Sequence, residues 1–506
     1  MDTWKEDYVS EVPYVQRFYP ELTPQLMRFA LRWKGIDAPV APFRYCELGS
    51  GFGNSVNINA AANPESTFIG IDFLTEHTES AQSLADEAGT PNVSFYADSF
   101  EQFENRDEAP FDFICLHGVW SWVNAENRQR IVEIIRNRLN PGGIVYISFN
   151  CLPGWAPAMP LRDLLWFHQD TSDAPILEKI DSGLKFAADL YETQSGYFSE
   201  NKGFERSLRA MKGENRSVLA HEYFNRNWTP MYFSQVAEQM TAANLTFAAP
   251  VSLIDQFDPL TISPAAQQQL AKTTDPTLRE TVLDFLVNRR FRRDLFVRNP
   301  KQLDVGNFDH LMDERFALMI PRSDLKLKHN LARGEVQLDA QIHEPIADAL
   351  ASGPRTLHEL LQQPALATLS RELVVQAVTI AVGIGYVQPA LPEEGESGRK
   401  TSTDRYNRTV CERARKGGTN EVLPSPVTGG GVRINNFEAM YLAAENAGQD
   451  PVDATWETLQ QQKRRMSREG IQLVSDTDNL TALRQEYEAF CQRKRPVLER
   501  LGLIPE

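Results

Sequence analysis

The stretch YCELGSGFG, residues 45–53, is the strongest indication of fold in this chain. Apolar residues run into three glycines spaced G-x-G-x-G, which is typical of a β-strand that ends in a tight turn before a helix. Glycines in such a turn let backbone N–H groups approach a ligand closely, and the helix that follows presents its N-terminus to the same point. The stretch therefore predicts a ligand-binding turn after the first strand of an α/β sheet.

The residues around the glycines favour S-adenosylmethionine (AdoMet) over a nicotinamide dinucleotide. Both cofactors use such a turn, but the dinucleotide form requires a small residue at position 54, where Asn54 would crowd the helix against the strand. A carboxylate at Glu47 fits AdoMet better, because it can attract the cationic amino end of that cofactor. We predict that Glu47 binds the cofactor together with Gly49, Gly51 and Gly53.

Residues 41–150 alternate between short apolar strands and helices, which predicts βαβ units and a parallel sheet with both faces covered. The turn from Asn140 to Gly143 ends a helix and starts the fifth strand. Two further strands are expected beyond a mostly helical segment, on either side of a long helix over 265–290. The expected strands are 43–48, 67–71, 93–97, 111–116, 144–149, 245–253 and 293–297.

Two aspartates stand at strand ends where AdoMet would need them. Asp72 follows the second strand, where a carboxylate can accept both ribose hydroxyls. Asp98 follows the third strand and is placed to accept from the adenine amine, with Phe100 available to pack on the ring. Their neighbours Phe73 and Ser99 complete the predicted cofactor set.

In the order of these residues the chain resembles the class I AdoMet-dependent methyltransferases, which have a Rossmann-like, seven-stranded sheet. It is similar, within that class, to the bacterial group that carries a methyltransferase regulatory domain and includes the rickettsial-type protein-lysine methyltransferases of surface proteins. The resemblance implies AdoMet as cofactor and a protein lysine as acceptor. The strings that carry it are Tyr14, Phe18, Tyr19, ELTP (21–24), HGVWSWV (117–123), Asn150, PGW (153–155), HEY (221–223) and FRRDLFVR (291–298).

The predicted fold class is α/β, a Rossmann-like seven-stranded methyltransferase sheet with a helical insertion, plus an α-rich C-terminal half. That half is expected to include a winged-helix-like module. The expected regions are an N-terminal helical lid (1–40), the methyltransferase domain (41–310) with its insertion (about 155–228) and regulatory-domain-like region (about 216–300), the winged-helix-like module (311–392), and a polar linker (393–404) leading into a C-terminal helical region (393–506).

Residues just after the fourth and fifth strands should face the methyl group, since ligands of open α/β sheets bind beyond the carboxyl ends of the strands. His117 has two interpretations, a general base with an ordinary pKa of about 6.5 or a side chain that fixes the loop, and it is also a candidate for cofactor binding. The other catalytic candidates are Trp122 and Asn150, with Tyr14 and Tyr19 as a lid. The same segments contribute Phe18, Trp120, Ser121 and Trp155.

Trp122 and Trp155 could form the walls of a channel for lysine or a small molecule, or could simply pack. An apolar aromatic pocket favours the neutral amine of a lysine by desolvation, so lysine methylation does not require a dedicated base. The basic run Arg289, Arg290, Arg292 and Arg293 has Asp284 and Asp294 nearby. We therefore expect a helix end with internal salt bridges there, and not a site for an acidic acceptor.

The composition of the chain limits the kinds of partner that we expect it to bind. The net charge of −16 over 506 residues disfavours nucleic acid as a ligand. The predicted third helix of the winged-helix-like module has Arg371 as its only cation, so protein recognition or packing is expected there. Five scattered cysteines form no metal spacing, and we predict no metal site. Without a secretory signal or an 18-residue apolar stretch, we predict a cytoplasmic protein that does not enter membranes.

Three functions remain open at this point. The first is methyl transfer to lysine in a protein substrate, which the extra modules could hold. The second is methylation of a small molecule or glycan precursor, in which case the C-terminal half would scaffold the enzyme or form a homodimer. The third is an AdoMet-sensing module without catalysis, because fold and cofactor do not fix chemistry.

Overall fold

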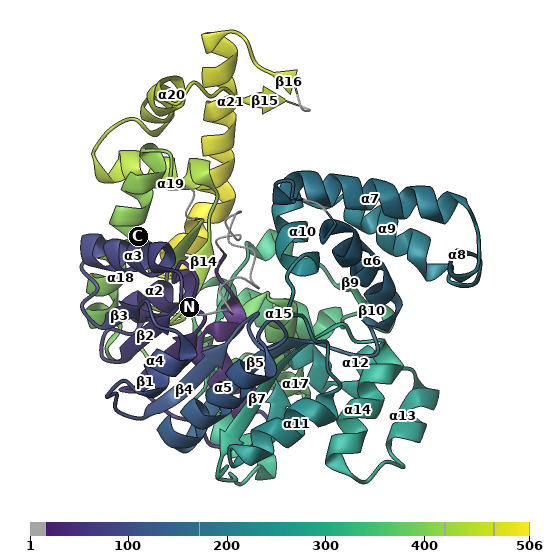
Figure 1. Cartoon of the computed structure of the whole chain (residues 1–506). Coiled ribbons are helices and arrows are strands. Elements are labelled where there is room, and N and C mark those ends of the chain that lie inside the picture. Colours follow the sequence, from purple (N-terminus) through teal and green to yellow (C-terminus); the bar gives the residue numbers. More distant parts are fainter. Residues whose placement is uncertain (1–16, 172, 419–420, 469–470, 505–506) are drawn as a thin grey trace.

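The computed structural model describes residues 17–171, 173–418, 421–468 and 471–504 (Figure 1). A seven-stranded sheet forms its centre. The helices α6 to α10 (residues 159–223) and the C-terminal helices stand on opposite sides of the upper half in that view. Across the described ranges, none of the helices is both long and apolar enough to pass through a bilayer.

The central sheet has the strand order β3-β2-β1-β4-β5-β7-β6, which confirms the predicted fold class. Strands β1 to β5 pair in parallel, and β7 runs antiparallel between β5 and β6. The order reverses between β1 and β4, the point at which such sheets open a binding crevice. The strands are β1 (Arg44–Leu48), β2 (Thr67–Ile71), β3 (Val93–Tyr96), β4 (Phe111–Leu116), β5 (Leu139–Asn150), β6 (Leu245–Pro250) and β7 (Phe291–Arg298).

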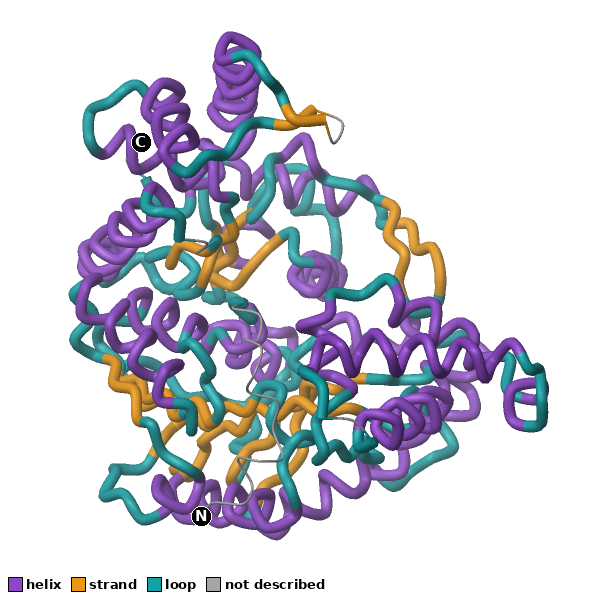
Figure 2. The backbone as a smooth tube through the Cα atoms, turned by 45° about the horizontal axis from the view of Figure 1, so that its top comes forward, coloured by secondary structure: helices purple, strands orange, loops and turns teal. Residues whose placement is uncertain are grey.

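Alternate residues of the strands belong to two apolar layers, one on each face of the sheet. Helices cover both faces (Figure 2). Tyr45 and Phe113 belong to one layer, whereas Cys46 and Ile114 belong to the other. The first layer includes residues of α1 (Pro24–Arg32), α2 (Asn54–Ala62) and α3 (Thr75–Ala88), and the second includes residues of α4 (Phe100–Glu104), α5 (Ala125–Arg138) and α11 (Phe233–Ala242). A short 3-10 turn, η2 (Pro20–Leu22), precedes α1.

The segment after β5 is helical and has an apolar core of its own, which includes Leu161, Ile180 and Phe204. The long helix α7 contacts α6, α9 and α10, so these helices form a separate small bundle beside the sheet. The elements are η3 (Ala156–Ala158), α6 (Met159–Gln169), α7 (Ile176–Glu192), α8 (Tyr197–Glu200), α9 (Gly203–Lys212) and α10 (Arg216–Tyr223).

The single long helix expected over 265–290 is wrong. The chain instead forms α13 (Pro264–Leu270) and α14 (Pro276–Val287). Asp275 caps the second helix by accepting from the backbone N–H of Leu278, and Pro276 occupies its first turn, where a missing N–H costs nothing. The segment between β6 and α13 contains η4 (Leu253–Gln256) and α12 (Asp258–Thr261).

Residues 311–392 combine helices with a three-stranded antiparallel sheet of order β11-β8-β12. The helix α17 buries its apolar side, including Val374 and Val378, in the layer that covers the central sheet. The winged-helix assignment stays a prediction. The elements, with those just before them, are η5 (Gly306–Leu311), β8 (Arg315–Leu318), η6 (Arg322–Asp324), β9 (Lys328–Leu331), β10 (Gly334–Gln337), α15 (Ala340–Ala351), β11 (Arg355–Thr356), α16 (Leu357–Leu361), α17 (Arg371–Ile384) and β12 (Val387–Ala390).

The polar linker predicted over 393–404 is also wrong, because α18 (Glu396–Arg415) includes most of it. Arg399 is buried and donates to the backbone carbonyls of Pro392, Glu394 and Pro426. Buried carbonyl acceptors thus satisfy a residue that would otherwise favour solvent. The rest of the helix packs on α2 and α3, so the segment joins the C-terminal region firmly to the sheet.

The glycine-rich loop 424–431 is a buried turn between β13 (Val422–Pro424) and β14 (Gly431–Arg433). A Cβ atom at Gly430 would lie 2.8 Å from the side chain of Thr23, and one at Gly431 2.9 Å from the ring of Phe18. The C-terminal region therefore closes tightly on the N-terminal segment. Its remaining elements are α19 (Asn436–Asn446), α20 (Pro451–Gln461), β15 (Ser467–Arg468), β16 (Ile471–Gln472), α21 (Asp476–Ala489), a π-helical turn η7 (Phe490–Lys494) and α22 (Arg495–Arg500).

Candidate active site

A cavity of about 230 Å³ lies at the carboxyl ends of β1, β2, β4 and β5. Its lining comes from distant parts of the chain: the glycine turn, the segments after β2 and β4, the end of β5, the end of α10 and the start of β7. A second, much smaller cavity adjoins it between Asp72, Asp98 and Phe100. The position at the reversal of strand order is where ligands of open α/β sheets bind.

The glycine turn has the conformation that its sequence requires. Gly49, Gly51 and Gly53 have φ angles of +77°, +52° and +65°. A Cβ atom at Gly51 would meet nothing within 4 Å, so this residue exposes bare backbone to the cavity. One at Gly53 would lie 2.5 Å from the ring of Phe95, and Gly53 does not line the cavity. Gly53 therefore serves packing of α2, and direct cofactor contact at this position is not supported.

Asp72 lines both cavities and holds the glycine turn in place. One carboxylate oxygen accepts from the backbone N–H of Gly51 at 2.9 Å, and the other accepts from that of Leu74 at 3.0 Å. Nδ1 of His77 lies 3.4 Å from the second oxygen. A carboxylate with these backbone bonds still has lone pairs free for ribose hydroxyls.

Glu47 is a buried carboxyl group that faces the cavity from the end of β1. The hydroxyl of Tyr45 donates a weak hydrogen bond of 3.4 Å to it, and within the described ranges no cationic side chain pairs with it. Burial raises the pKa of Glu47 to about 8; the bond from Tyr45 acts against this rise, and the Asp72 carboxylate adds to it. Such a group is prepared to receive the charge of a cationic ligand.

Asp98 lies at the smaller cavity with Ser99, Phe100 and Phe73, which the sequence placed in one site. Its carboxylate already holds Arg106 by two hydrogen bonds of 2.7 and 3.0 Å. Asp98 thus forms an ion pair that the sequence did not reveal. Its role toward an adenine amine stays a prediction.

His117, just after β4, lines the larger cavity. Its Nδ1 lies 2.8 Å from the hydroxyl of Tyr146, and the ring of Tyr19 lies over it with centroids 3.7 Å apart. Burial lowers the pKa of His117 to about 4; nearby Glu21 opposes this and Arg293 reinforces it. The imidazole is therefore neutral at pH 7.

The far wall of the cavity combines aromatic rings and amides. Trp122 and Phe291 contribute the rings. Asn150, the last residue of β5, is buried and also lines the cavity, and its Nδ2 has no partner among the described residues. Trp122 also lies near Trp228, with ring centroids 6.3 Å apart. Four more asparagines line this wall: Asn124, Asn127, Asn225 and Asn227.

The sequence reasoning missed the contribution of α10 to this wall. His221 and Glu222 line the cavity, as do Asn225 and Asn227 just beyond the helix. Residues 221–223 are among the strings that carry the family resemblance, but the sequence alone assigned them no function. Nothing in their spacing along a helical segment indicates that they lie next to the strand ends in the folded chain.

Several expected site residues lie elsewhere. Tyr14 falls outside the described residues. Phe18 is buried against the C-terminal region and does not cover the cavity, whereas Tyr19 does line it. Trp120 and Trp155 are buried and are not part of the lining. Ser121 acts on the backbone, since its hydroxyl accepts from the N–H of Asn150 at 2.9 Å.

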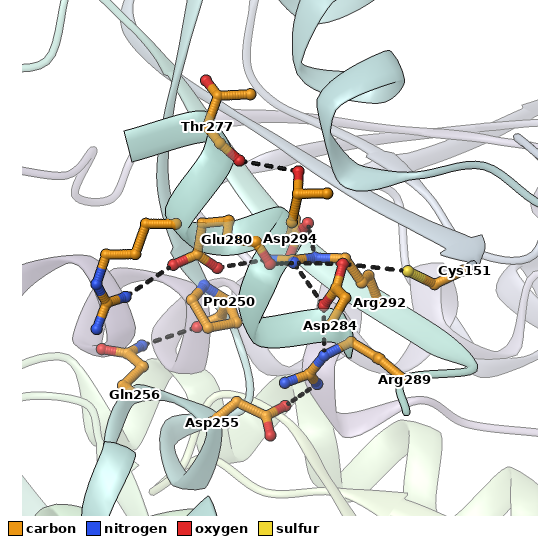
Figure 3. Close-up of polar contacts among 12 residues, drawn as sticks. Cys151, Pro250, Asp255, Gln256, Thr277, Glu280, Asp284, Arg289, Arg292 and Asp294 are labelled. Atoms are coloured by element: carbon orange, nitrogen blue, oxygen red, sulfur yellow. Dashed lines mark hydrogen bonds and ion pairs between the residues drawn. The ribbon is translucent and has the colours of Figure 1, made fainter. Parts of the chain in front are cut away.

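The arginines at the start of β7 form internal ion pairs, as expected. Arg292 is buried and bonds Glu280, Asp284 and Asp294 at 2.7 to 2.9 Å (Figure 3). The thiol of Cys151, at the end of β5, donates to the same Asp284 at 3.2 Å. This network connects β7 and α14 to the end of β5, where Asn150 lines the cavity.

The neighbouring arginines are also engaged. Arg289 pairs with Asp255 at 2.9 Å, and Arg293 pairs with Glu21 at 3.0 Å. The guanidinium of Arg290 lies 4.6 Å from the centre of a Trp155 ring. In the part of the chain that the structure describes, no group of three or more His, Cys, Asp or Glu side chains could hold a metal ion.

Comparison with known proteins gives two family matches. Residues 41–179 match a family described as a methyltransferase domain, and residues 215–298 match one described as a predicted methyltransferase regulatory domain. The second range contains β6, β7 and the helices α11 and α14. The region named for regulation thus supplies two strands of the central sheet and, through residues 221–227 and Phe291, part of the cavity wall.

Relatives extend over most of the chain. An uncharacterized protein of Synechocystis is 40% identical over 504 residues, which covers 99% of this chain and all of that protein. An uncharacterized protein of Rickettsia prowazekii is 27% identical and covers 62% of this chain and 57% of its own length. The structure of PKMT2 from Rickettsia typhi in complex with AdoHcy has a TM-score of 0.72 and 20% identity, covering 97% of this chain and 99% of that one.

Proposed function

Since this chain belongs to the class I AdoMet-dependent methyltransferases that carry a predicted methyltransferase regulatory domain, we propose that it methylates lysine side chains of a protein substrate. AdoMet is its cofactor, and methyl transfer is its reaction. The acceptor is the part of the function that the proposal adds.

The residues at the glycine turn fit AdoMet. Gly51 leaves the backbone accessible, Asp72 can accept from ribose hydroxyls, and the buried Glu47 carboxyl lacks a cation within the described ranges. When bound, the cofactor supplies a methyl group on a positively charged sulfur, which makes the methyl carbon electrophilic. The chain itself must orient the acceptor in line with that carbon and exclude water.

One observation supports lysine more than any other: the buried imidazole of His117, which lines the cavity beside the ring of Tyr19, is a poor base. A proton transfer from an ordinary lysine ammonium, with a pKa of about 10.4, to His117, with a pKa of about 4, would cost ~9 kcal/mol. Desolvation between rings such as Tyr19 and Trp122 favours the neutral amine instead, and the neutral amine is the nucleophile.

Charge at the cavity agrees with a cationic acceptor. Glu222 lines the cavity from the end of α10. Carboxylates attract a lysine ammonium before it is desolvated. PKMT2 of Rickettsia typhi, whose name denotes a protein-lysine methyltransferase, has the same overall fold. These points support the proposal.

The test is incubation of the purified enzyme with methyl-labelled AdoMet and lysate from the source organism. Label is counted separately in acid-stable protein and in small molecules, and labelled proteins are digested for mass spectrometry. Gly51→Arg provides the blank, because its side chain would enter the cavity and its charge would oppose a cationic cofactor. Gly398→Arg is the matched control, since Gly398 is exposed on α18 and a Cβ there meets nothing within 4 Å.

The expected result is label on lysine in protein with the wild type and Gly398→Arg, and none with Gly51→Arg. Label confined to the small-molecule fraction would overturn the lysine acceptor in favour of a small molecule or glycan precursor. The asparagine-rich wall could bind the hydroxyl groups of such a molecule. AdoMet binding without label in any fraction would instead favour the sensing module.

A further inference from the structure

The hydroxyl of Tyr146, on β5, lies 2.8 Å from Nδ1 of His117, just after β4. Tyr146 is completely buried, so water cannot complete the bonding of its hydroxyl. Two residues later on β5, Oγ of Ser148 accepts from the backbone N–H of Gly118 at 2.9 Å, next to His117 in the chain. The imidazole and the phenol are therefore held against each other by contacts on both segments.

The direction of this bond follows from the protons that the two groups have. Tyr146 has one phenol proton, and among the described residues Nδ1 of His117 is the acceptor that lies at hydrogen-bond distance from it. A neutral imidazole has a proton on one nitrogen and a lone pair on the other. A lone pair on Nδ1 therefore lets the buried phenol donate its proton.

The reverse direction would leave a buried group unsatisfied. If Nδ1 of His117 donated to Tyr146, the phenol proton would have no acceptor at hydrogen-bond distance among the described residues. An unsatisfied buried donor is costly, so donation from Tyr146 to Nδ1 is favoured.

We propose that Tyr146 is a positioning residue that holds His117 in the tautomer with the proton on Nε2, so that His117 enters the cavity as a hydrogen-bond donor. Nδ1 accepts from Tyr146, and the proton on Nε2 is left to donate to an acceptor atom of a ligand in the cavity. The ring of Tyr19, with its centroid 3.7 Å from that of His117, restricts rotation of the imidazole. In this arrangement the lone pair of the His117 ring, on Nδ1, is engaged by Tyr146. His117 therefore cannot take a proton from the methyl acceptor.

The proposal is tested by nitrogen NMR on protein labelled with ¹⁵N-histidine, because the two ring nitrogens of each tautomer give widely separated signals. The chain has eight histidines, and the His117 signals are identified by their loss in His117→Gln. We expect the wild type to show a proton on Nε2 and a lone pair on Nδ1 from pH 6 to 9. A proton on Nδ1, or two protons within that range, would overturn the proposal.

Tyr146→Phe tests the positioning role. Without the phenol proton, the fraction of His117 with its proton on Nδ1 should rise at least fivefold above the wild-type level, whereas Tyr406→Phe, at another buried tyrosine on α18, should leave it unchanged. An unchanged tautomer ratio in a folded Tyr146→Phe would overturn the role of Tyr146. If that variant fails to fold, Tyr146→Met replaces it, with the same expectation and the same contrary outcome. The measurement needs no methyl acceptor, so its result is independent of whether the acceptor is lysine.

Discussion

The carboxylate of Asp72, at the end of β2, accepts a hydrogen bond of 2.9 Å from the backbone N–H of Gly51, at the turn after β1. Two neighbouring strand ends are thus joined through the residue that faces the cofactor side of the cavity. The same carboxylate also fixes the start of α3 through the N–H of Leu74. Its role in binding therefore cannot be separated from the shape of the turn that it holds.

Asp72→Ala should weaken AdoMet binding by about 10- to 100-fold, because charge-assisted hydrogen bonds contribute about 1.5–3 kcal/mol each. Isothermal titration calorimetry with AdoMet or AdoHcy measures the change. Asp112→Ala is a suitable control, since Asp112 also accepts from a backbone N–H, that of Arg44, but lies at the opposite end of the sheet. Unchanged affinity in Asp72→Ala would exclude the ribose role.

AdoMet binding should release a proton near neutral pH. Free Glu47 is mostly protonated below its pKa of about 8, and a cationic ligand beside it favours the ionised form. The affinity for AdoMet should therefore rise as pH increases from 6 to 8 and level off above 8. Calorimetry in buffers of different ionisation enthalpy counts the released proton, and Glu47→Gln should remove both the release and the pH dependence.

The same pKa has a consequence for stability without ligand. A carboxyl whose folded-state pKa lies above its unfolded value of about 4.3 makes the folded protein bind the extra proton, so stability falls as pH rises from that value to about 8. Glu47→Gln should flatten this part of the profile. Urea unfolding at pH 6 and pH 8 compares the two proteins, and parallel profiles would show that Glu47 is ionised at both values.

The cofactor half of this site could be read from the sequence because its signals are local. Strand, glycine turn and the carboxylates Glu47 and Asp72 lie within a short stretch, and each follows a predictable strand end. The ion pair between Asp98 and Arg106 is also close in sequence, but either residue alone is compatible with many roles. A pairing of this kind becomes visible only when the chain has turned back on itself.

The acceptor half depends on contacts between distant segments. His221 and Glu222 reach the cavity because the insertion folds back over the strand ends, and no periodicity encodes that return. The polar composition of residues 393–404 indicates a linker, yet Arg399 finds three buried carbonyls and the segment becomes helical. Composition reports the average preference for solvent, whereas the fold supplies partners for individual polar groups.

Arg292→Met should destabilise the protein by about 3–5 kcal/mol, because it leaves buried carboxylates of Asp284 and Asp294 without their counter-charge. β7 pairs with both β5 and β6, so the loss affects the whole edge of the sheet. Urea unfolding measures the change. Arg290→Met, which removes a partly exposed cation over Trp155, should cost less than about 1 kcal/mol. If Arg292→Met lowered the free energy of unfolding by no more than about 1 kcal/mol, as expected for Arg290→Met, the buried network would add no stability.

Phe291→Ala should impair use of the acceptor while leaving AdoHcy affinity intact. Phe291 lies at the start of β7, opposite Asn150, is 39% exposed and lines the cavity. Removal of a ring that desolvates a neutral amine should raise the acceptor concentration needed for half-maximal rate by about tenfold, which corresponds to 1.4 kcal/mol. Phe285→Ala, at an exposed phenylalanine of α14 outside the cavity lining, provides the matched control. A loss of AdoHcy affinity in Phe291→Ala would place this ring on the cofactor side and reverse the assignment of the two halves of the cavity.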